Sequence, residues 1–487
     1  FQKETQSKNS GQPRISKDTQ SSENSKKSCE QKPTGSYSYG ICDKSVKIKY
    51  INNKGPFLCR GILKWKIKLP FLRTGDLLPS KDMEGLHKHT KVCYTEYLEG
   101  IAMKYTLMNK NVSLIDFHWE EFLGVESTAV IDKEYQRIWF LKDLNTWLQY
   151  RSVTKHRLHM DKLLRAIGLT GTKAIIDFSK GLSLTDTLWV NIDDRFQWEQ
   201  VNLFDNEFDE VIEKIAFDGG MYGKHFSTTS PEFGTNGMFA KCWHRETDGQ
   251  IYLYKQGSQR FANAGWEVYS ELYASQILDR LGYAHAKYDL IKYRGRLVSR
   301  CPLFTSPKKM LLPFTAILES ESATFRAVLE TCQKYGIVKE FTEHLITDAL
   351  IVNEDRHLGN LGVICDADTF EVKGMAPIYD NGSSLCCYYR PELESESLVQ
   401  YSQALHPVLY SDFVEGVRAT ATREQLEQLG CLNNFRFDTS GQYNLPDERL
   451  KSLEELVQVQ LRKLQSIKPH QSHKAAEATS AFRNLEN

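Results

Sequence analysis

Residues 353–360 read NEDRHLGN, and residues 378–382 read IYDNG. Before the first of these segments, residues 341–352 carry apolar side chains at helical spacing, which predicts a helix. After it, residues 361–365 form an apolar run that predicts a strand. Residues 353–360, named here the catalytic turn, therefore place acids, basic side chains and amides together between a helix and a strand.

The side chains of the catalytic turn are those that phosphoryl transfer requires. Asp355 can orient an acceptor hydroxyl, and Asn360 can offer an amide oxygen to Mg²⁺. Their spacing is that of the Asp and Asn in a kinase catalytic loop. Asp380, in the second segment, can supply a further carboxylate for metal-bridged phosphates. These residues predict a kinase-type site.

Each of these residues also has an ordinary structural interpretation. Asp355 suits a turn cap, Asn360 suits left-handed backbone, and Asp380 suits a tight turn before a glycine. His357 can hold the loop through a backbone hydrogen bond, which we favour, or it can contact phosphate. Metal ligation by His357 is not expected, because no second histidine stands at ligand spacing. Features elsewhere in the sequence favour the chemical interpretation.

A loop of small and hydroxyl-bearing residues at 226–237, named here the phosphate loop, precedes two predicted strands at 238–243 and 251–255. An Asp-Gly pair between the strands predicts a hairpin. Backbone N–H groups and hydroxyls of such a loop can wrap phosphate oxygens. The residues expected to contact phosphate are Ser227, Thr228, Thr229, Ser230, Asn236 and Gly237.

A lysine and a glutamate complete the set of residues expected at a kinase-type site. Lys255 ends the second strand, and a helix predicted at 266–281 carries Glu271 on its apolar face. A carboxylate in that position is costly unless it is paired. We therefore expect a Lys255–Glu271 ion pair that orients ATP phosphates, with Glu267 as the rival partner one turn earlier.

These motifs resemble those of the HipA-like serine/threonine protein kinases of bacteria, on the pattern Asp355-x-His357-x-x-Asn360 and the IYDNG segment. The resemblance covers about residues 110–466. It implies an α+β, two-lobed protein-kinase-like fold, with a small β-rich N-lobe, a mainly helical C-lobe, and ATP and Mg²⁺ in the cleft. It also implies that Asp355 is the catalytic base and that Asn360 and Asp380 are metal ligands.

Members of this family can autophosphorylate a serine in the phosphate loop, which makes Ser227 and Ser230 the candidates here. The resemblance further implies a protein substrate and allows a regulatory or antitoxin-like protein partner. Two features depart from the family. The first 100 residues do not match it, and the phosphate loop lacks a glycine triplet.

Changes in composition along the chain suggest domain boundaries. Residues 1–40 have almost no aliphatic side chains and are expected to be disordered. A strand is predicted at 136–140, and a basic, aromatic cluster at 147–157 suits a solvated helix face better than a nucleic-acid contact. The expected parts are a polar tail (1–40), an N-terminal extension with an accessory module from about 110 (41–170), the N-lobe (171–305), the C-lobe (306–467) and a polar tail (468–487).

Bulk composition limits the partners. Lys+Arg and Asp+Glu both total 62, so no net field attracts nucleic acid or membrane. Apolar runs are far shorter than the ~20 residues of a spanning helix. The 11 cysteines include no Cys-x-x-Cys pair, which predicts free thiols in the cytoplasm. The favoured function is an ATP- and Mg²⁺-dependent protein kinase. The alternatives are a nucleotide-binding regulatory module without turnover and a small-molecule kinase.

Overall fold

The chain divides into two units, Phe1–His87 and Lys88–Asn487, which are described separately. In the first unit the computed structural model describes a hairpin of β1 (Ser38–Ile41) and β2 (Lys44–Lys47). The described residues are 38–41, 44–47, 103–121, 127–152, 157–220, 226–227, 229–235, 237–259, 265–320 and 322–468. The two expected polar tails therefore lie almost wholly outside the described residues.

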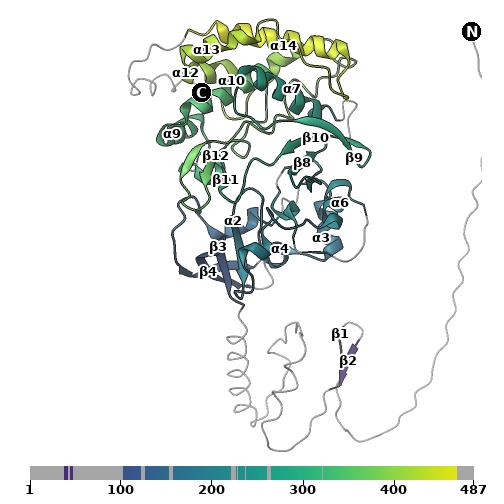
Figure 1. Cartoon of the computed structure of the whole chain (residues 1–487), viewed down its shortest axis with the longest axis vertical. Coiled ribbons are helices and arrows are strands. Elements are labelled where there is room, and N and C mark those ends of the chain that lie inside the picture. Colours follow the sequence, from purple (N-terminus) through teal and green to yellow (C-terminus); the bar gives the residue numbers. More distant parts are fainter. Residues whose placement is uncertain are drawn as a thin grey trace, which may run out of the picture. The chain divides into compact units, whose positions relative to one another are not determined.

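The second unit opens with an antiparallel sheet in the order β5-β4-β3-β6. Its members are β3 (Tyr105–Asn109), β4 (Val112–Glu120), β5 (Thr128–Glu134) and β6 (Leu188–Ile192), with α2 (Leu144–Tyr150) and α4 (Gly171–Ser179) nearby in Figure 1. The strand predicted at 136–140 is wrong. Ile138 and Phe140 are buried as alternation suggested, but their backbone turns and β5 takes the place beside β4.

Two short helices pack against each other. They are α3 (Met160–Ile167) and α6 (Glu210–Asp218), which share an apolar cluster with Phe233 of the phosphate loop. α3 ends at Gly168, whose φ of +80° is the left-handed cap that glycine allows. The apolar contact places the phosphate loop against helices that precede it in the chain.

A second antiparallel sheet has the order β7-β8-β10-β9. Its strands are β7 (Lys241–Arg245), β8 (Ile251–Lys255), β9 (Asp289–Tyr293) and β10 (Arg296–Pro302). The predicted helix is α7 (Trp266–Leu281), which contacts β9 and β10. In the β7–β8 register Lys241 stands directly opposite Lys255, so both side chains project from the same face of the hairpin.

The remainder of the unit is largely helical and surrounds α10 (Val338–Ile351), the predicted helix that leads to the catalytic turn. Figure 1 shows α10 and α7 below the C-terminal helices. The other elements are α8 (Phe314–Ile317), α9 (Phe325–Tyr335), α11 (Leu398–Tyr401), α12 (Phe413–Thr420), α13 (Arg423–Gln428) and α14 (Asp447–Gln465), with the antiparallel strands β11 (Lys309–Pro313), β12 (Gly362–Asp366) and β13 (Val372–Met375). None of the helices described is long and apolar enough to cross a membrane. Mixed helices and antiparallel sheets make this an α+β fold, as predicted.

Candidate active site

Lys255 lies at the centre of the site. Its Nζ donates to Glu271 Oε1 at 2.9 Å and also forms an ion pair with Asp380. The Lys255 and Glu271 side chains are 8% and 1% exposed. Burial alone would lower the pKa of Lys255, but the carboxylates of Asp380 and Glu271 raise it above its ordinary value. The lysine is therefore held as an ammonium, and the rival Glu267 instead accepts a hydrogen bond from the Ser258 N–H.

Asp380 has a backbone φ of +57°, which turns its side chain back toward Lys255. The next residue, Asn381, donates its N–H to Glu271 Oε2 at 2.7 Å. A Cβ added at Gly382 would lie 3.3 Å from both Lys255 Nζ and Glu271 Oε1, so only a glycine leaves this pair undisturbed. Burial opposes ionisation, but Lys255 and Lys241 hold the pKa of Asp380 below its usual range. Asp380 is therefore a carboxylate.

Backbone hydrogen bonds shape the catalytic turn. Asn353 caps the N–H of Asp355 at 3.1 Å, and Asn360 Nδ2 donates to the Asp355 carbonyl at 3.1 Å. His357 Nδ1 accepts from the Gly359 N–H at 3.0 Å, a contact that holds the loop. Burial, together with the charge of Asp380, raises the pKa of Asp355. A raised pKa suits a group that must accept a proton.

Arg356 connects the catalytic turn to the Asp380 segment. Its guanidinium pairs with Asp348 of α10 at 3.0 Å, and it donates to Asn381 Oδ1 at 2.6 Å and to the Tyr379 carbonyl at 2.5 Å. The residue is 2% exposed. Sequence reasoning missed this role, although an Asp on the buried face of a predicted helix is a signal that a cation must be near.

The phosphate loop is only partly described, because Thr228 and Asn236 lie outside the described residues. Ser227 donates its N–H to Asp209, and its Oγ accepts from the Thr229 N–H at 3.2 Å. Ser230 is 2% exposed and caps the short helix η2 (Pro231–Gly234). The loop therefore offers Ser227 and Thr229 near solvent, whereas Ser230 is packed inside.

Lys241 is a second lysine at the site that sequence reasoning missed. It is 5% exposed, and a Cβ at Gly237 would collide with its Nζ. Burial and the neighbouring charge of Lys255 lower the pKa of Lys241 to about 7. Its amine therefore lies against the end of the phosphate loop, within electrostatic reach of the Lys255–Asp380 pair. A lysine at the first position of β7, opposite Lys255 in the hairpin, is the signal that could have found it.

The donor set suits magnesium. In the part of the chain that the structure describes, Asp380 pairs with Lys255 through Oδ1, and Asn360 donates through its amide nitrogen to the Asp355 carbonyl. A carboxylate oxygen and an amide oxygen are thus available for a hard cation that completes its shell with water and phosphate. No cluster of three or more His, Cys, Asp or Glu side chains suited to a metal occurs among the described residues. The residues fit a metal that arrives with a nucleotide.

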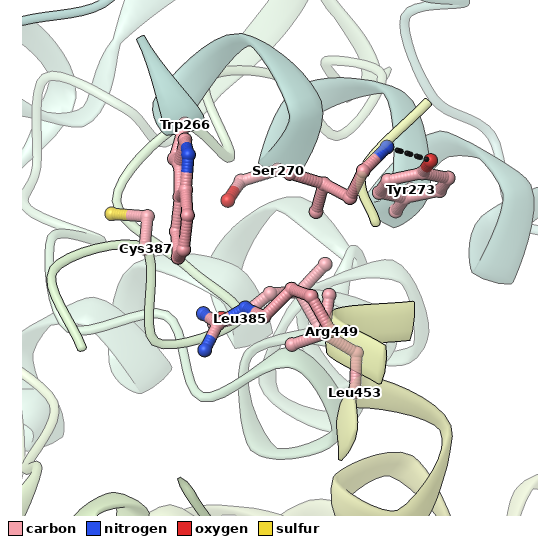
Figure 2. A pocket seen from close by; sticks show the side chains of 8 residues that line it. Trp266, Ser270, Tyr273, Leu385, Cys387, Arg449 and Leu453 are labelled. Carbon is pink, nitrogen blue, oxygen red and sulfur yellow. Dashed lines mark hydrogen bonds between the residues drawn. The ribbon is translucent and has the colours of Figure 1, made fainter. Parts of the chain in front are cut away.

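The chain beyond Gly382 passes a small cavity shown in Figure 2. The residues lining it are Trp266, Ser270, Tyr273, Leu385, Cys387, Leu445, Arg449 and Leu453. Arg449 of α14 donates to the carbonyls of Leu385 and Cys386 at 3.1 and 2.8 Å. Both of these residues have positive φ, so Arg449 supports a strained turn next to the site. This cavity contains none of the expected phosphate-binding residues.

No family model matches the chain, and no curated protein matches it. Similar solved structures include the Helicobacter pylori proinflammatory kinase CtkA, with 18% identity and a TM-score of 0.37, covering 47% of this chain and 92% of that one. They also include HipA of Shewanella oneidensis MR-1, solved with HipB and operator DNA, with 10% identity and a TM-score of 0.42, covering 74% of this chain and 96% of that one. The first of these is named a kinase, and the second is a HipA protein, the name carried by the family that the sequence resembles.

Proposed function

We propose that the chain is an ATP- and Mg²⁺-dependent kinase that transfers the γ-phosphoryl group to a serine or threonine hydroxyl of a protein. The observation that carries this proposal is the position of Lys255, which pairs at once with Glu271 and Asp380. Through Arg356 the Asp380 segment is tied to the catalytic turn. A cation for phosphate, a carboxylate for metal and a carboxylate for the acceptor are thus held by one connected set of contacts.

The proposed roles follow from the surroundings of each group. Lys255, fixed by Glu271, would exchange Asp380 for phosphate oxygens. The amine of Lys241, whose pKa burial and Lys255 lower to about 7, would take up a proton beside bound phosphate and so add a second positive charge. Bound Mg²⁺ neutralises charge on the β- and γ-phosphates, and Asp380 and Asn360 would hold it. Asp355 would orient the acceptor hydroxyl and take its proton as the new O–P bond forms and the bond to ADP breaks.

Ser227 is the favoured site of autophosphorylation in the phosphate loop. Its hydroxyl lies near solvent, whereas Ser230 is 2% exposed and caps η2. Phosphorylation of Ser230 would require the helix to open. The cytoplasmic location and an antitoxin-like partner stay predictions from the sequence and its resemblance, and a small-molecule acceptor is the alternative for the same set of residues.

Mass spectrometry after incubation with Mg-ATP tests the proposal. The expected result is a phosphorylated peptide containing Ser227, absent when Mg²⁺ is chelated. Thermal stabilisation by Mg-ATP without phosphorylation of the chain or consumption of ATP would contradict the kinase proposal. That outcome would favour the nucleotide-binding regulatory module instead.

A further inference from the structure

Arg157 reaches into the phosphate loop from a separate part of the chain. It precedes α3, and its side chain is 0% exposed. The guanidinium donates to the carbonyls of Glu232 and Thr235 at 2.9 and 3.3 Å, and also to the carbonyl of Lys241. It forms an ion pair with the Glu232 carboxylate as well. One side chain thus contacts the loop near its middle, near its end and at the first residue of β7.

Glu232 extends this connection to the sheet. Its second oxygen, Oε1, accepts the N–H of Trp243 at 2.8 Å. The Trp243 indole N–H in turn donates to the Thr235 hydroxyl at 2.9 Å, and that hydroxyl donates to the Pro231 carbonyl at 2.8 Å. The loop and the start of β7 are therefore joined by side chains on both sides of Arg157.

The cost of burying these charges indicates a specific role. Removing a carboxylate and a guanidinium from water is expensive, and apolar residues of similar volume often stabilise a fold equally well. Here the planar guanidinium of Arg157 donates to three backbone carbonyls, which can accept these hydrogen bonds only if the loop backbone keeps one conformation. The conformation so fixed brings Gly237 against the Lys241 amine, opposite Lys255.

We propose that Arg157, with Glu232, is a positioning residue for the nucleotide phosphates. It holds residues 232–235 and 237–241 in the conformation that presents Lys241 to the phosphates beside Lys255. Since its side chain is completely buried, Arg157 does not touch the nucleotide. This inference rests on the proposed function, because it assumes that nucleotide phosphates occupy the site.

A positioning role for the phosphates predicts that the loss of affinity in an Arg157 variant occurs only for ligands that carry phosphate. The experiment measures the dissociation constants of Mg-ATP and of adenosine by calorimetry for the wild type and for Arg157→Lys, which keeps the charge but loses the planar guanidinium. Mg-ATP binding should weaken about tenfold, while adenosine binding stays unchanged. In steady-state assays KM for ATP should rise while kcat changes little, because the acceptor side is not involved.

The control is a second buried arginine pair in the same region. Arg151 and Asp186 have side chains 9% and 4% exposed, and Arg151 donates to the Gly181 carbonyl. Arg151→Lys should lower the melting temperature comparably and leave the ratio of Mg-ATP to adenosine affinity unchanged. Should Arg157→Lys fail to fold, Glu232→Gln carries the same prediction, since it keeps an acceptor for the Trp243 N–H and loses the ion pair.

Three results would overturn the inference. The first is wild-type affinity for Mg-ATP in Arg157→Lys. The second is an equal loss of affinity for Mg-ATP and for adenosine in that variant. The third is the same phosphate-specific loss in Arg151→Lys. If the wild type binds neither ligand, the proposed function and this inference fall together. Normal binding by the wild type with an unaffected Arg157→Lys overturns the positioning role alone.

Discussion

At the scale of single residues, the site is an arrangement of opposite charges in which Lys255 and Glu271 are buried and the Asp380 side chain is 34% exposed. Asp380 and Glu271 keep Lys255 charged, and Lys255 and Lys241 keep Asp380 charged. Burial beside Lys255 lowers the pKa of Lys241 to about 7. Phosphate oxygens arriving between the two lysines would replace the Asp380 carboxylate at Lys255 and release it for a cation.

His344 provides a test of burial beneath the catalytic turn. It is 2% exposed on α10, and its Nδ1–H donates to the Glu340 carbonyl at 3.0 Å. Burial and the nearby Arg356 charge lower the pKa of His344 to about 3 from 6.5. An unfolded chain takes up this proton below pH 6.5 and the folded protein does not. The free energy of unfolding therefore carries no penalty from His344 above pH 6.5, and it decreases as the pH falls from 6.5 toward 3.

Substitution makes this contribution measurable. Between about pH 6 and pH 4, the free energy of unfolding of the wild type should fall more steeply than that of His344→Gln, by up to about 1.4 kcal/mol per pH unit. Urea denaturation at several pH values gives both slopes. Parallel slopes would show that His344 is protonated in the folded protein over this range.

At the scale of elements, α10 and the Asp380 segment act together through Arg356. Arg356→Lys keeps a positive charge for Asp348 but loses donors to Asn381 and the Tyr379 carbonyl. We expect kcat to fall more than about tenfold, while the dissociation constant of Mg-ATP changes less. Radiolabel transfer and calorimetry measure the two quantities.

The matched control for Arg356 is Arg300→Lys. Arg300 pairs with Glu246 and Asp289 on the outer part of the β7–β10 sheet, where its side chain is 23% exposed. This variant should retain activity. An Arg356→Lys protein with normal kcat would contradict the connecting role.

The elements that sequence could predict are those whose apolar periodicity is unbroken. α7 begins and ends at the expected residues, because its apolar positions and the glycine that follows it are local signals. The strand predicted at 136–140 does not form. Ile138 and Phe140 are buried at alternate positions, but β4 pairs with β5 and not with this segment. Alternation reports burial, and pairing depends on distant residues.

The residues of the candidate site also differ in whether a local signal in the sequence could predict their contacts. The roles of Asp355, Asn360 and Asp380 stay predictions from their spacing along the chain. The Lys255–Glu271 contact, predicted from the cost of an unpaired buried carboxylate, is confirmed. Arg157 and Arg151 were expected on a solvated helix face, and this expectation is wrong, since both are buried in ion pairs. Their partners Glu232 and Asp186 lie far along the chain, so these ion pairs could not be predicted from any local pattern in the sequence.

At the scale of the whole second unit, the accessory region and the rest share one core. β6 pairs with β3 across the boundary expected at 170, and one apolar cluster extends from Tyr105 to Ile467. Asn109 Nδ2 also donates to the Ala367 carbonyl at 2.7 Å. A fragment of residues 171–468 would therefore leave β6 without its neighbour and expose part of this core.

We expect the 171–468 fragment to lack a cooperative thermal transition, whereas the 103–468 fragment should unfold cooperatively. Circular dichroism during heating compares the two. A cooperative transition in the shorter fragment, at a temperature similar to that of the longer one, would show that the boundary at 170 separates independent domains.

The central claim is that the acids of the catalytic turn and the Asp380 segment carry out phosphoryl transfer. The most direct measurement is incorporation of labelled γ-phosphate from Mg-ATP into the full chain, for the wild type, Asp355→Asn and Asp380→Asn, with melting temperatures to confirm folding. The predicted result is labelling of the wild type and a loss of about a hundredfold or more in each folded variant. Wild-type labelling in both variants would contradict the account.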